Sequence, residues 1–320
     1  MLDVSIIVVN WNAGSMISTC LSLIADELQR VNGECIVIDN ASDQGDMKLL
    51  SRRFPQFKLI SNTANLGFAK AVNQGISQSA GRYLLFVNPD TFLTPGTVDK
   101  VLRFLESRPE VGIVGPRVVN PDGSLQGSAR AFPHFATALF GRTSFISRLF
   151  PSNGLTRRQV LCFESTVQRP AAVDWVSGAC MFVRREVFGD VGLFDERFFL
   201  FWEDADFCWR AHNRGWVVIY YPEASVTHLI GGCSRHAPIR SLLAFHVSAF
   251  RLYRIHVTQS VLHPLNVVAA AGLFIHLIAT VAWFGVRQLS RVADSQYDVG
   301  QFENFRPEVI DTEAEAPRAL

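Results

Sequence analysis

Residues 4–10 read VSIIVVN, a short apolar run that ends in an asparagine. An apolar run of this length, rich in β-branched residues, is typical of a buried β-strand. Similar runs, CIVID, FKLIS and YLLFVN, follow at residues 35–39, 57–61 and 83–88. Amphipathic stretches that suit helices separate the runs, at residues 15–30, 46–54 and 68–80. This alternation predicts an α/β fold built around a parallel sheet.

The composition of the chain disfavours several classes of protein. Among the 320 residues, 30 Lys and Arg stand against 29 Asp and Glu, and a net charge of +1 gives no basis for nucleic-acid binding. The six cysteines form no Cys-x-x-Cys pair, which argues against structural zinc and favours reduced, cytosolic thiols. Neither G-x-G-x-x-G nor G-x-x-x-x-G-K occurs, which disfavours dehydrogenases and P-loop ATPases. Because the first strand begins at residue 4 without a basic leader, we expect no signal peptide.

The second half of the chain predicts a further portion of sheet. AVDWVSGACMFVRR at residues 172–185 and WVVIYYP at residues 216–222 have the pattern of strands. Between them, residues 203–215 have helical spacing, and Gly215 would close that helix. The composition changes near residues 236 and 288, so we expect a folded unit over residues 1–236 that consists of two halves, 1–120 and 121–236.

Residues 237–291 form a second, apolar and basic segment. They include residues 265–286, a stretch of 22 residues without a formal charge. This stretch is long enough to span a membrane, and it also suits a helix that lies on a bilayer or on the protein itself. The remaining residues, 292–320, are acidic and contain few packing side chains, so we expect a disordered tail.

Polar residues follow all four apolar runs of the first half. Asn10 and Asn12 follow the first run, Asp39 ends the second, and Asn88-Pro89-Asp90 follows the fourth. Turns and helix caps explain the polar residues after any one of these runs. Polar residues after all four runs favour a ligand site at the carboxyl edge of the sheet. Asp39 suits hydrogen bonds from a ribose hydroxyl or a base imide. Asp90 suits a divalent cation whose remaining ligands are water and phosphate.

Two further groups of residues extend this site. Asn65 and Gly67 precede a helix that begins near Ala69 and carries Asn73, so backbone N–H groups there could face a phosphate or sugar. The alternative is an ordinary glycine turn with a cap. His228 ends another strand, and it is either a buried structural histidine or a metal ligand if it lies close to Asp90.

An acidic cluster lies among aromatic residues at 198–209. Glu203, Asp204 and Asp206 stand here, and burial beside aromatic rings would raise the pKa of a carboxyl toward neutrality. Such a group suits a general base, and the rings suit the apolar faces of a sugar. The alternative is a helix N-terminus whose first turn is acidic because the helix dipole favours it.

The ordered set of motifs VSIIVVNWN, VIDNASDQG, NLGFAKAVNQG, LLFVNPDTFL, VSGACMFVRREVFGDVGLFDERFFLFWEDADFCWR and THLIGG resembles the family 2 glycosyltransferases. Within that family the chain is similar to the bacterial rhamnosyltransferase-like members, over about residues 3–235. The resemblance implies a GT-A fold, a Rossmann-like mixed sheet with C-terminal apolar helices. It implies a nucleotide-binding half at 1–120 and an acceptor-binding half at 121–236.

The resemblance also implies residue roles. The nucleoside would lie near Asn10, Asn12 and Asp39, and the rest of the donor near Asn65, Gly67 and Asn73. The metal motif of the family, usually D-x-D, corresponds to N-P-D here, so Asn88 and Asp90 would bind Mg²⁺ or Mn²⁺, with His228 as a further ligand. The acidic pair Glu203-Asp204 would be catalytic, with Asp204 as the base and with Glu203 and Asp206 as alternatives. The acceptor would contact Trp175, Ser177, Gly178, Trp202 and Asp206.

The implied reaction is an inverting transfer of a sugar from a nucleotide-diphosphate donor to a hydroxyl of a saccharide or lipid-linked acceptor. dTDP-rhamnose is the favoured donor, a UDP-sugar is possible, and cell-surface polysaccharide synthesis is the expected setting. Residues 237–291 would hold the enzyme at the cytoplasmic face of the cell membrane. Two alternatives are a non-catalytic sugar-nucleotide-binding membrane scaffold, which the presence of Asp90 and Asp204 opposes, and a nucleotidyltransferase, whose basic glycine-rich loop is missing.

Overall fold

The computed structural model describes residues 2–43, 46–133, 167–229 and 238–290. The strands are β1 (Val4–Asn10), β2 (Gly33–Asp39), β3 (Lys58–Ser61), β4 (Tyr83–Val87), β5 (Thr91–Leu93), β6 (Val111–Val119), β7 (Ala129–Arg130), β8 (Ala171–Ala172), β9 (Trp175–Val176), β10 (Cys180–Arg184) and β11 (Val217–His228). The helices are α1 (Ser15–Glu27), α2 (Asp46–Arg53), α3 (Phe68–Ser77), α4 (Thr97–Ser107), α8 (Arg185–Val191), α9 (Glu203–His212), α10 (Pro238–Tyr253), the π-helical turn η3 (Arg254–Thr258) and α11 (Leu265–Ser290).

The main sheet has the order β3-β2-β1-β4-β10-β6-β11-β5, with β8 paired to β11. Its first four strands are parallel, which confirms the strand-helix alternation predicted for the first half of the chain. β10 then runs antiparallel between β4 and β6, so the sheet is mixed. The expected further portion of sheet therefore continues the first portion instead of forming a separate unit.

The prediction of a single strand over residues 172–185 is wrong, because this stretch is divided between β8, β9 and β10. β9 leaves the main sheet and pairs with β7 in a two-stranded ribbon. Between β9 and β10, the backbone N–H groups donate outside any strand pair: Ser177 to the Ser128 carbonyl and Gly178 to the Asp204 carboxylate. The chain thus bends out of the sheet where it approaches α9.

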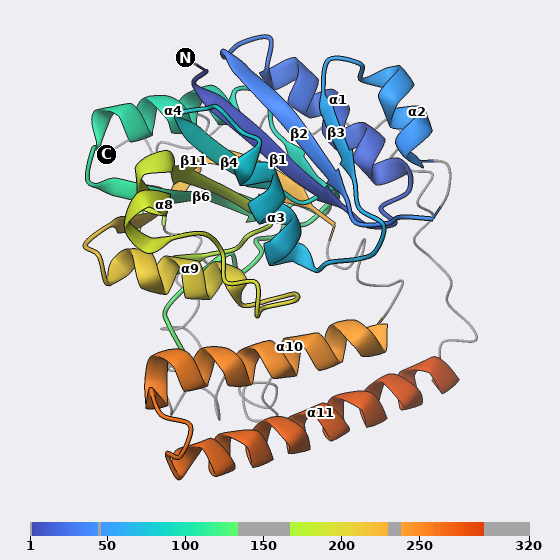
Figure 1. Ribbon diagram of the computed structural model, residues 1–320, viewed down its shortest axis with the longest axis vertical. Helices are drawn as coiled ribbons and strands as arrows, with labels where there is room; N and C mark the ends of the chain where they lie inside the picture. The colour runs from blue at the N-terminus through green and yellow to red at the C-terminus, as the bar shows by residue number, and fades with distance from the viewer. Residues whose placement is uncertain (1, 44–45, 134–166, 230–237, 291–320) are drawn as a thin grey trace, which may run out of the picture.

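Helices cover both faces of the sheet (Figure 1). Along β1, Val4, Ile6 and Val8 join the core cluster that contains apolar residues of α1 and α4. Ile7 and Val9 point to the opposite face and join the cluster formed with α3, α8 and α9. This period of two is what a strand buried on both faces requires. The result is a three-layer α/β/α unit, with the ligand-binding edge expected where β1, β2 and β4 end.

α10, η3 and α11 follow this unit, with α10 lying between it and α11 (Figure 1). Leu252 of α10 is buried in the same core cluster as α3 and α9. His246 of α10 and His276 of α11 join the two helices through a hydrogen bond of 2.8 Å between Nε2 and Nδ1. Residues Leu265–Ala282 of α11 have a mean hydropathy of 2.1, yet only 6% of them are buried. The acidic tail predicted to be disordered lies outside the described residues.

Candidate active site

The carboxyl ends of β1 and β2 bring Asn10 and Asp39 together. The two residues are register partners, and the Asn10 amide donates to Asp39 Oδ1 at 2.8 Å. Ser42 donates its hydroxyl to Asp39 Oδ1 at 2.6 Å and its backbone N–H to Oδ2 at 3.1 Å. Asp39 is buried, so these partners fix its carboxylate at the sheet edge. Ser42 was not among the predicted site residues, although Ser three positions after an Asp is a recognisable local hydrogen-bonding pattern.

Asn12 lies just beyond this pair. Its φ is 52°, a left-handed conformation that asparagine tolerates better than most residues. Its side chain accepts from the backbone N–H of Asp43 at 2.7 Å and donates to Asp43 Oδ2 at 3.3 Å. The structure therefore places Asn10, Asn12 and Asp39 in one corner, and their contact with a nucleoside stays a prediction.

The loop before α3 lies beside the same corner. Asn65 Oδ1 accepts from the Gly67 backbone N–H at 2.9 Å, and Asn40 donates to the Gly67 carbonyl at 3.0 Å. Gly67 has a φ of +86°, and a Cβ at this position would lie 2.5 Å from the carbonyl oxygen of Phe199. Only glycine fits such a backbone position. The loop is thus pressed between the end of β2 and the segment that precedes α9.

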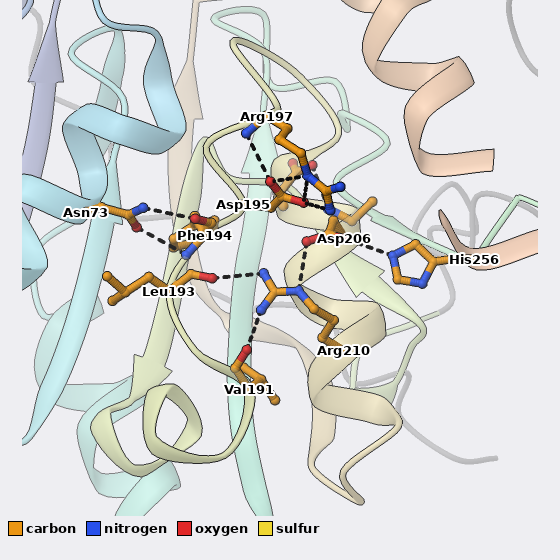
Figure 2. A network of polar contacts seen from close by, with 11 residues as sticks. Asn73, Val191, Leu193, Phe194, Asp195, Arg197, Asp206, Arg210 and His256 are labelled. Carbon is orange, nitrogen blue, oxygen red and sulfur yellow. Dashed lines mark hydrogen bonds and ion pairs between the residues drawn. The ribbon is translucent and has the colours of Figure 1, made fainter. Parts of the chain in front are cut away.

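Asn73 has a different environment from the one expected of a donor-binding residue. Its amide donates to the Phe194 carbonyl at 2.9 Å, and its Oδ1 accepts from the Phe194 backbone N–H at 3.1 Å (Figure 2). The side chain is buried and also donates to Glu196 Oε1 at 3.1 Å. Because both ends of the amide are occupied, we expect Asn73 to hold the loop before α9 rather than to touch the donor.

Asp90 is buried in the turn between β4 and β5. Its backbone carbonyl accepts from the Leu229 N–H at 2.9 Å, which ties the turn to the end of β11. Its Oδ1 has no hydrogen-bond partner among the residues that the structure describes. His228 Nε2 lies 3.4 Å from that oxygen, so the two predicted metal ligands do meet.

Gln126 sets the orientation of the His228 ring. The Gln126 amide nitrogen donates to the His228 carbonyl at 2.6 Å and to Asn120 Oδ1 at 2.9 Å. Gln126 Oε1 therefore faces His228 Nδ1, 2.9 Å away, and Nδ1 carries the ring proton. In the neutral ring this leaves the lone pair of Nε2 directed at Asp90. Sequence reasoning missed Gln126, which lies 102 positions from His228.

This arrangement fits a divalent cation. A buried carboxylate oxygen without a partner and an imidazole lone pair face each other, and both are good ligands for Mn²⁺, while Mg²⁺ prefers the carboxylate. No group of three His, Cys, Asp or Glu side chains converges anywhere in the described ranges. Water and a diphosphate are suitable further ligands for such a cation. Asn88 binds the Ala179 carbonyl through its backbone N–H at 3.0 Å, and a metal contact of its side chain stays a prediction.

Asp204 stands in the first turn of α9, where two backbone donors hold its carboxylate. Oδ2 accepts from the Gly178 N–H and Oδ1 from the Ala205 N–H, each at 2.8 Å. A Cβ on Gly178 would lie 3.4 Å from Asp204 Cβ, so the two chain segments touch closely. Ala179 follows Gly178, and its carbonyl accepts from the backbone N–H of Asn88. Gly178 and Ala179 therefore connect Asp204 to the N-P-D motif.

The environment of α9 raises the pKa of both residues of the acidic pair. Burial raises the pKa of Glu203 well above its usual range, and the neighbouring Asp204 charge raises it further. Burial also raises the pKa of Asp204, although the N–H groups of Gly178 and Ala205 and the charge of Arg130 oppose this. Glu203 Oε2 has no hydrogen-bond partner among the described residues, which is consistent with a carboxyl that holds its proton. Two backbone N–H groups bind the carboxylate of Asp204, whereas one oxygen of Glu203 has no partner among the described residues, so the geometry favours Asp204 as the ionised member of the pair.

Aromatic residues surround the expected acceptor side. The rings of Trp175 and Trp202 lie 5.9 Å apart, and the Trp202 indole N–H is buried without a partner among the described residues. Arg130 pairs with Trp175 across the β7–β9 ribbon and places its guanidinium 5.1 Å from the Trp175 ring. Sequence reasoning missed Arg130 because only this strand pairing brings it near Asp204. The structure therefore gathers Trp175, Ser177, Gly178 and Trp202 around Asp204, and their contact with an acceptor stays a prediction.

Asp206 is buried, and side chains bind both of its carboxylate oxygens. Arg210 Nε donates to Oδ2 at 2.8 Å, and His256 Nε2 donates to Oδ1 at 2.7 Å (Figure 2). Arg210 continues to the carbonyls of Val191 and Leu193, at 2.6 and 3.0 Å. Asp206 is only 1% exposed. We therefore expect it to anchor α9, although the sequence suggested an acceptor contact or an alternative base.

Comparison with known families and relatives identifies the chain. A family model described as Glycosyl transferase family 2 matches residues 5–192. The chain belongs to this family. It is 34% identical to an N-acetylglucosaminyl-diphospho-decaprenol L-rhamnosyltransferase of Mycobacterium tuberculosis over 226 residues, which are 67% of this chain and 72% of that protein. It is 25% identical to the dTDP-rhamnosyl transferase RfbF of Shigella flexneri, over 69% of this chain and 70% of that one.

Solved structures confirm the expected GT-A fold of this family 2 glycosyltransferase. The chain superposes with a TM-score of 0.56 on GalNAc-T7, solved with UDP, GalNAc and Mn²⁺, at 16% identity over 79% of this chain and 48% of that one. It superposes with a TM-score of 0.50 on the mannosyltransferase PcManGT of Pyrobaculum calidifontis, solved with GDP-Man and Mn²⁺, at 17% identity over 92% and 79% of the two chains. Both neighbours bind a nucleotide and Mn²⁺.

Proposed function

We propose that this enzyme is an inverting glycosyltransferase that moves rhamnose from dTDP-rhamnose to a hydroxyl of a lipid-linked saccharide during cell-surface polysaccharide synthesis. The two rhamnosyltransferase relatives favour this donor. The name of the mycobacterial relative describes an acceptor in which a diphosphate joins a sugar to a polyprenol, and we extend that class of acceptor to this chain. The observation that carries the proposal is the environment of Asp204. Two backbone N–H groups hold its carboxylate beside the rings of Trp175 and Trp202.

The proton step depends on Asp204. Its carboxylate accepts the proton of the acceptor hydroxyl while the hydroxyl oxygen forms a bond to the anomeric carbon of the donor. The bond between that carbon and the diphosphate oxygen breaks, and the nucleoside diphosphate leaves with the electron pair. The sugar is inverted in one step without a covalent intermediate. Trp175 and Trp202 offer ring faces for the acceptor, which orient its hydroxyl toward Asp204.

The leaving diphosphate carries growing negative charge. Asp90 and His228 would hold a divalent cation there, and such a cation neutralises that charge when bound. Asp39, fixed by Asn10 and Ser42, would accept hydrogen bonds from the nucleoside at the other end of the donor. The Asn65–Gly67 loop would lie against the sugar or phosphate between these two ends.

The pH dependence of transfer should report Asp204. A base must be ionised, and burial raises the pKa of Asp204, so kcat/KM should fall on the acid side at a pH above the ordinary aspartate value of about 3.9. A pH–rate profile of the whole chain measures this limb. Glu203→Gln should leave the position of the limb unchanged if Asp204 is the titrating base. Complete loss of the acid limb in that variant would assign the base to Glu203 instead.

A donor panel tests the proposed function directly. We expect the detergent-purified chain, given N-acetylglucosaminyl-diphospho-polyprenol, to release dTDP from dTDP-rhamnose and to add one deoxyhexose to the lipid by mass. Transfer from a UDP-sugar alone would show that the proposed donor is wrong, while the proposed type of reaction would stand. Release of pyrophosphate from a nucleoside triphosphate would show a nucleotidyltransferase, and nucleotide binding without any release would show a scaffold.

The C-terminal helices support a place at the cytoplasmic face of the membrane. α10 and α11 expose apolar side chains that a soluble protein would normally cover, including Ile239 at 67% exposure and Val267 at 73%. Because α11 is bound along α10, and α10 packs on the catalytic unit, we propose that both helices lie in the interface rather than that α11 crosses the bilayer. Because nucleotide-sugars are cytosolic, we propose that the helices lie on the cytoplasmic side of the membrane.

Charges placed on α11 should release the protein from lipid. Phe274→Asp with Ile275→Asp changes two neighbouring exposed apolar residues, so we expect binding to phosphatidylglycerol vesicles to weaken at least about tenfold. Flotation of the full chain with vesicles measures this. Leu49→Asp, at an equally exposed apolar position on α2, is the matched control and should float like the unchanged protein. Equal loss in the control, or no loss in the double variant, would contradict the assignment.

A further inference from the structure

The segment between residues 198 and 202 leads directly into the catalytic residues and is conformationally strained. Phe201 and Trp202 have φ values of 66° and 70°, in the left-handed region that bulky side chains avoid. A residue in this conformation persists only where its surroundings hold it. Trp202 is the residue immediately before Glu203 and Asp204 in α9. Whatever holds this segment therefore decides where the Asp204 carboxylate lies.

α10 holds one side of the segment. The Ser248 hydroxyl donates to the Leu200 carbonyl at 3.0 Å, and Ser248 is only 2% exposed. The ring of Phe245 lies 5.9 Å from that of Phe201 and 5.4 Å from that of Trp202. Both strained residues therefore pack against a helix that the sequence assigned to a separate, membrane-associated segment.

The start of α3, on the side where the donor is expected, holds the other end of the segment. Phe68, the first residue of α3, donates its backbone N–H to the Phe199 carbonyl at 2.7 Å. The segment thus lies between the Gly67 loop, where the donor is expected, and α10. A displacement on either side would move Trp202 and, with it, the start of α9.

η3 provides a second contact with α9. His256 donates to Asp206 Oδ1 at 2.7 Å (Figure 2). The His256 ring stacks on the Trp209 ring, with centroids 4.6 Å apart and an interplanar angle of 17°. Asp206 follows Asp204 by two positions in the same helix. This bond joins residues that are 50 positions apart and fixes α9 to the C-terminal segment close to the base.

The contact between Ser248 and Leu200 lies on the side of α10 that faces the catalytic unit. Ile239, Leu243 and Val247 are exposed and, at spacings of four residues, form a stripe along the helix. Ser248 and Leu252 are buried on the other side of the same helix. α10 therefore has a face toward the catalytic unit that is distinct from the face available to lipid.

We propose that Ser248 and His256 are positioning residues for Asp204, and that residues 238–258 belong to the catalytic unit. The composition placed the boundary of that unit at residue 236, ahead of both residues. The role rests on the proposed function of Asp204 as the base. Loss of either contact should let the strained segment relax and tilt the first turn of α9, and a shift of about 1 Å at a base can lower a rate by about 10²-fold.

Paired variants of His256 separate its hydrogen bond from its packing. His256→Phe keeps a ring that can stack on Trp209 but removes the N–H donor to Asp206. His256→Gln keeps an N–H donor and removes the ring. His212→Phe makes the same change on the exposed side of α9 and is the matched control. Ser248→Ala removes the other contact, and Ser260→Ala, at an exposed position, is its control.

Measurements of kcat and of nucleoside diphosphate binding on the full chain should distinguish these variants. We expect His256→Phe and Ser248→Ala to lower kcat about ten- to a hundredfold while nucleoside diphosphate binding stays within about twofold. His256→Gln should recover most of kcat, and both controls should match the unchanged enzyme. Unaltered kcat in His256→Phe and Ser248→Ala would overturn the proposal, and so would a loss of nucleotide binding as large as the loss of kcat.

Hydrogen exchange gives a readout that does not require transfer. Backbone amides of residues 199–205 should exchange faster in His256→Phe and Ser248→Ala than in the controls, while amides of β1 and β4 stay protected. Unchanged exchange at residues 199–205 would overturn the proposal even if kcat falls. If the unchanged enzyme transfers no sugar, the proposed function fails, and the exchange comparison still decides whether α10 and η3 hold the segment.

Discussion

Asp204→Asn is expected to lower kcat of sugar transfer by about 10²–10⁴-fold and to leave nucleoside diphosphate affinity within about twofold. The carboxylate uses one oxygen for the Gly178 N–H and the other for the Ala205 N–H, each at 2.8 Å. An asparagine keeps the shape and one acceptor oxygen, but its amide nitrogen cannot take a proton from an acceptor hydroxyl. Single-turnover transfer and calorimetric titration with dTDP measure the two quantities separately.

The matched control for this variant is Asp99→Asn. Asp99 lies in the first turn of α4, as Asp204 does in α9, and its partner Arg103 is an exposed neighbour four positions away. We expect this change to leave kcat and nucleotide binding unaltered, since exposed ion pairs of this kind contribute little. Turnover of Asp204→Asn within tenfold of the unchanged enzyme would contradict the assignment of the base.

Local patterns in the sequence predicted β1 to β4 and the helices α1, α2 and α3 that separate them, but not β5, α4 or β6. β1 and β4 are continuous apolar runs because a strand buried on both faces needs one, whereas β3 is a partly exposed strand at the edge of the sheet. The carboxyl ends of parallel strands meet at one edge, so Asn10 and Asp39 could be predicted to meet without any knowledge of their partners. The proximity of His228 to Asp90 follows from the pairing of β11 with β5. The resemblance to the family implied that His228 is a further metal ligand, but no pattern in the sequence predicted this strand pairing.

The residues that the sequence did not reveal depend on contacts between distant segments. Gln126 acts on His228 through a side-chain bond across 102 positions, and Arg130 reaches Trp175 only through the β7–β9 pairing. The resemblance to the family implied that Asp206 contacts the acceptor or is an alternative base. Its partner His256 lies in a segment whose composition suggests lipid contact, so no local pattern could assign the two residues to each other.

Asp90→Ala is expected to remove the part of nucleoside diphosphate binding that depends on a divalent cation. In the presence of Mn²⁺, we expect affinity for dTDP to fall at least about tenfold, whereas affinity in EDTA should stay within about twofold of the unchanged protein. The physical reason is that Asp90 Oδ1 has no hydrogen-bond partner among the described residues and faces His228 Nε2 at 3.4 Å. Asp90 Oδ1 is therefore available to bind a cation.

Calorimetry with dTDP, with Mn²⁺ and with EDTA, separates the two conditions without any need for turnover. Asp26→Ala, at an exposed position on α1, is the control and should behave like the unchanged protein in both. Gln126→Leu provides an independent variant of the same site: it removes the acceptor that keeps the proton on His228 Nδ1, so it should weaken Mn²⁺-dependent binding while Asp90 remains in place. Equal loss of dTDP affinity with Mn²⁺ and with EDTA in Asp90→Ala would reject the metal role, because a carboxylate that acts only through the cation has no effect once the cation is gone.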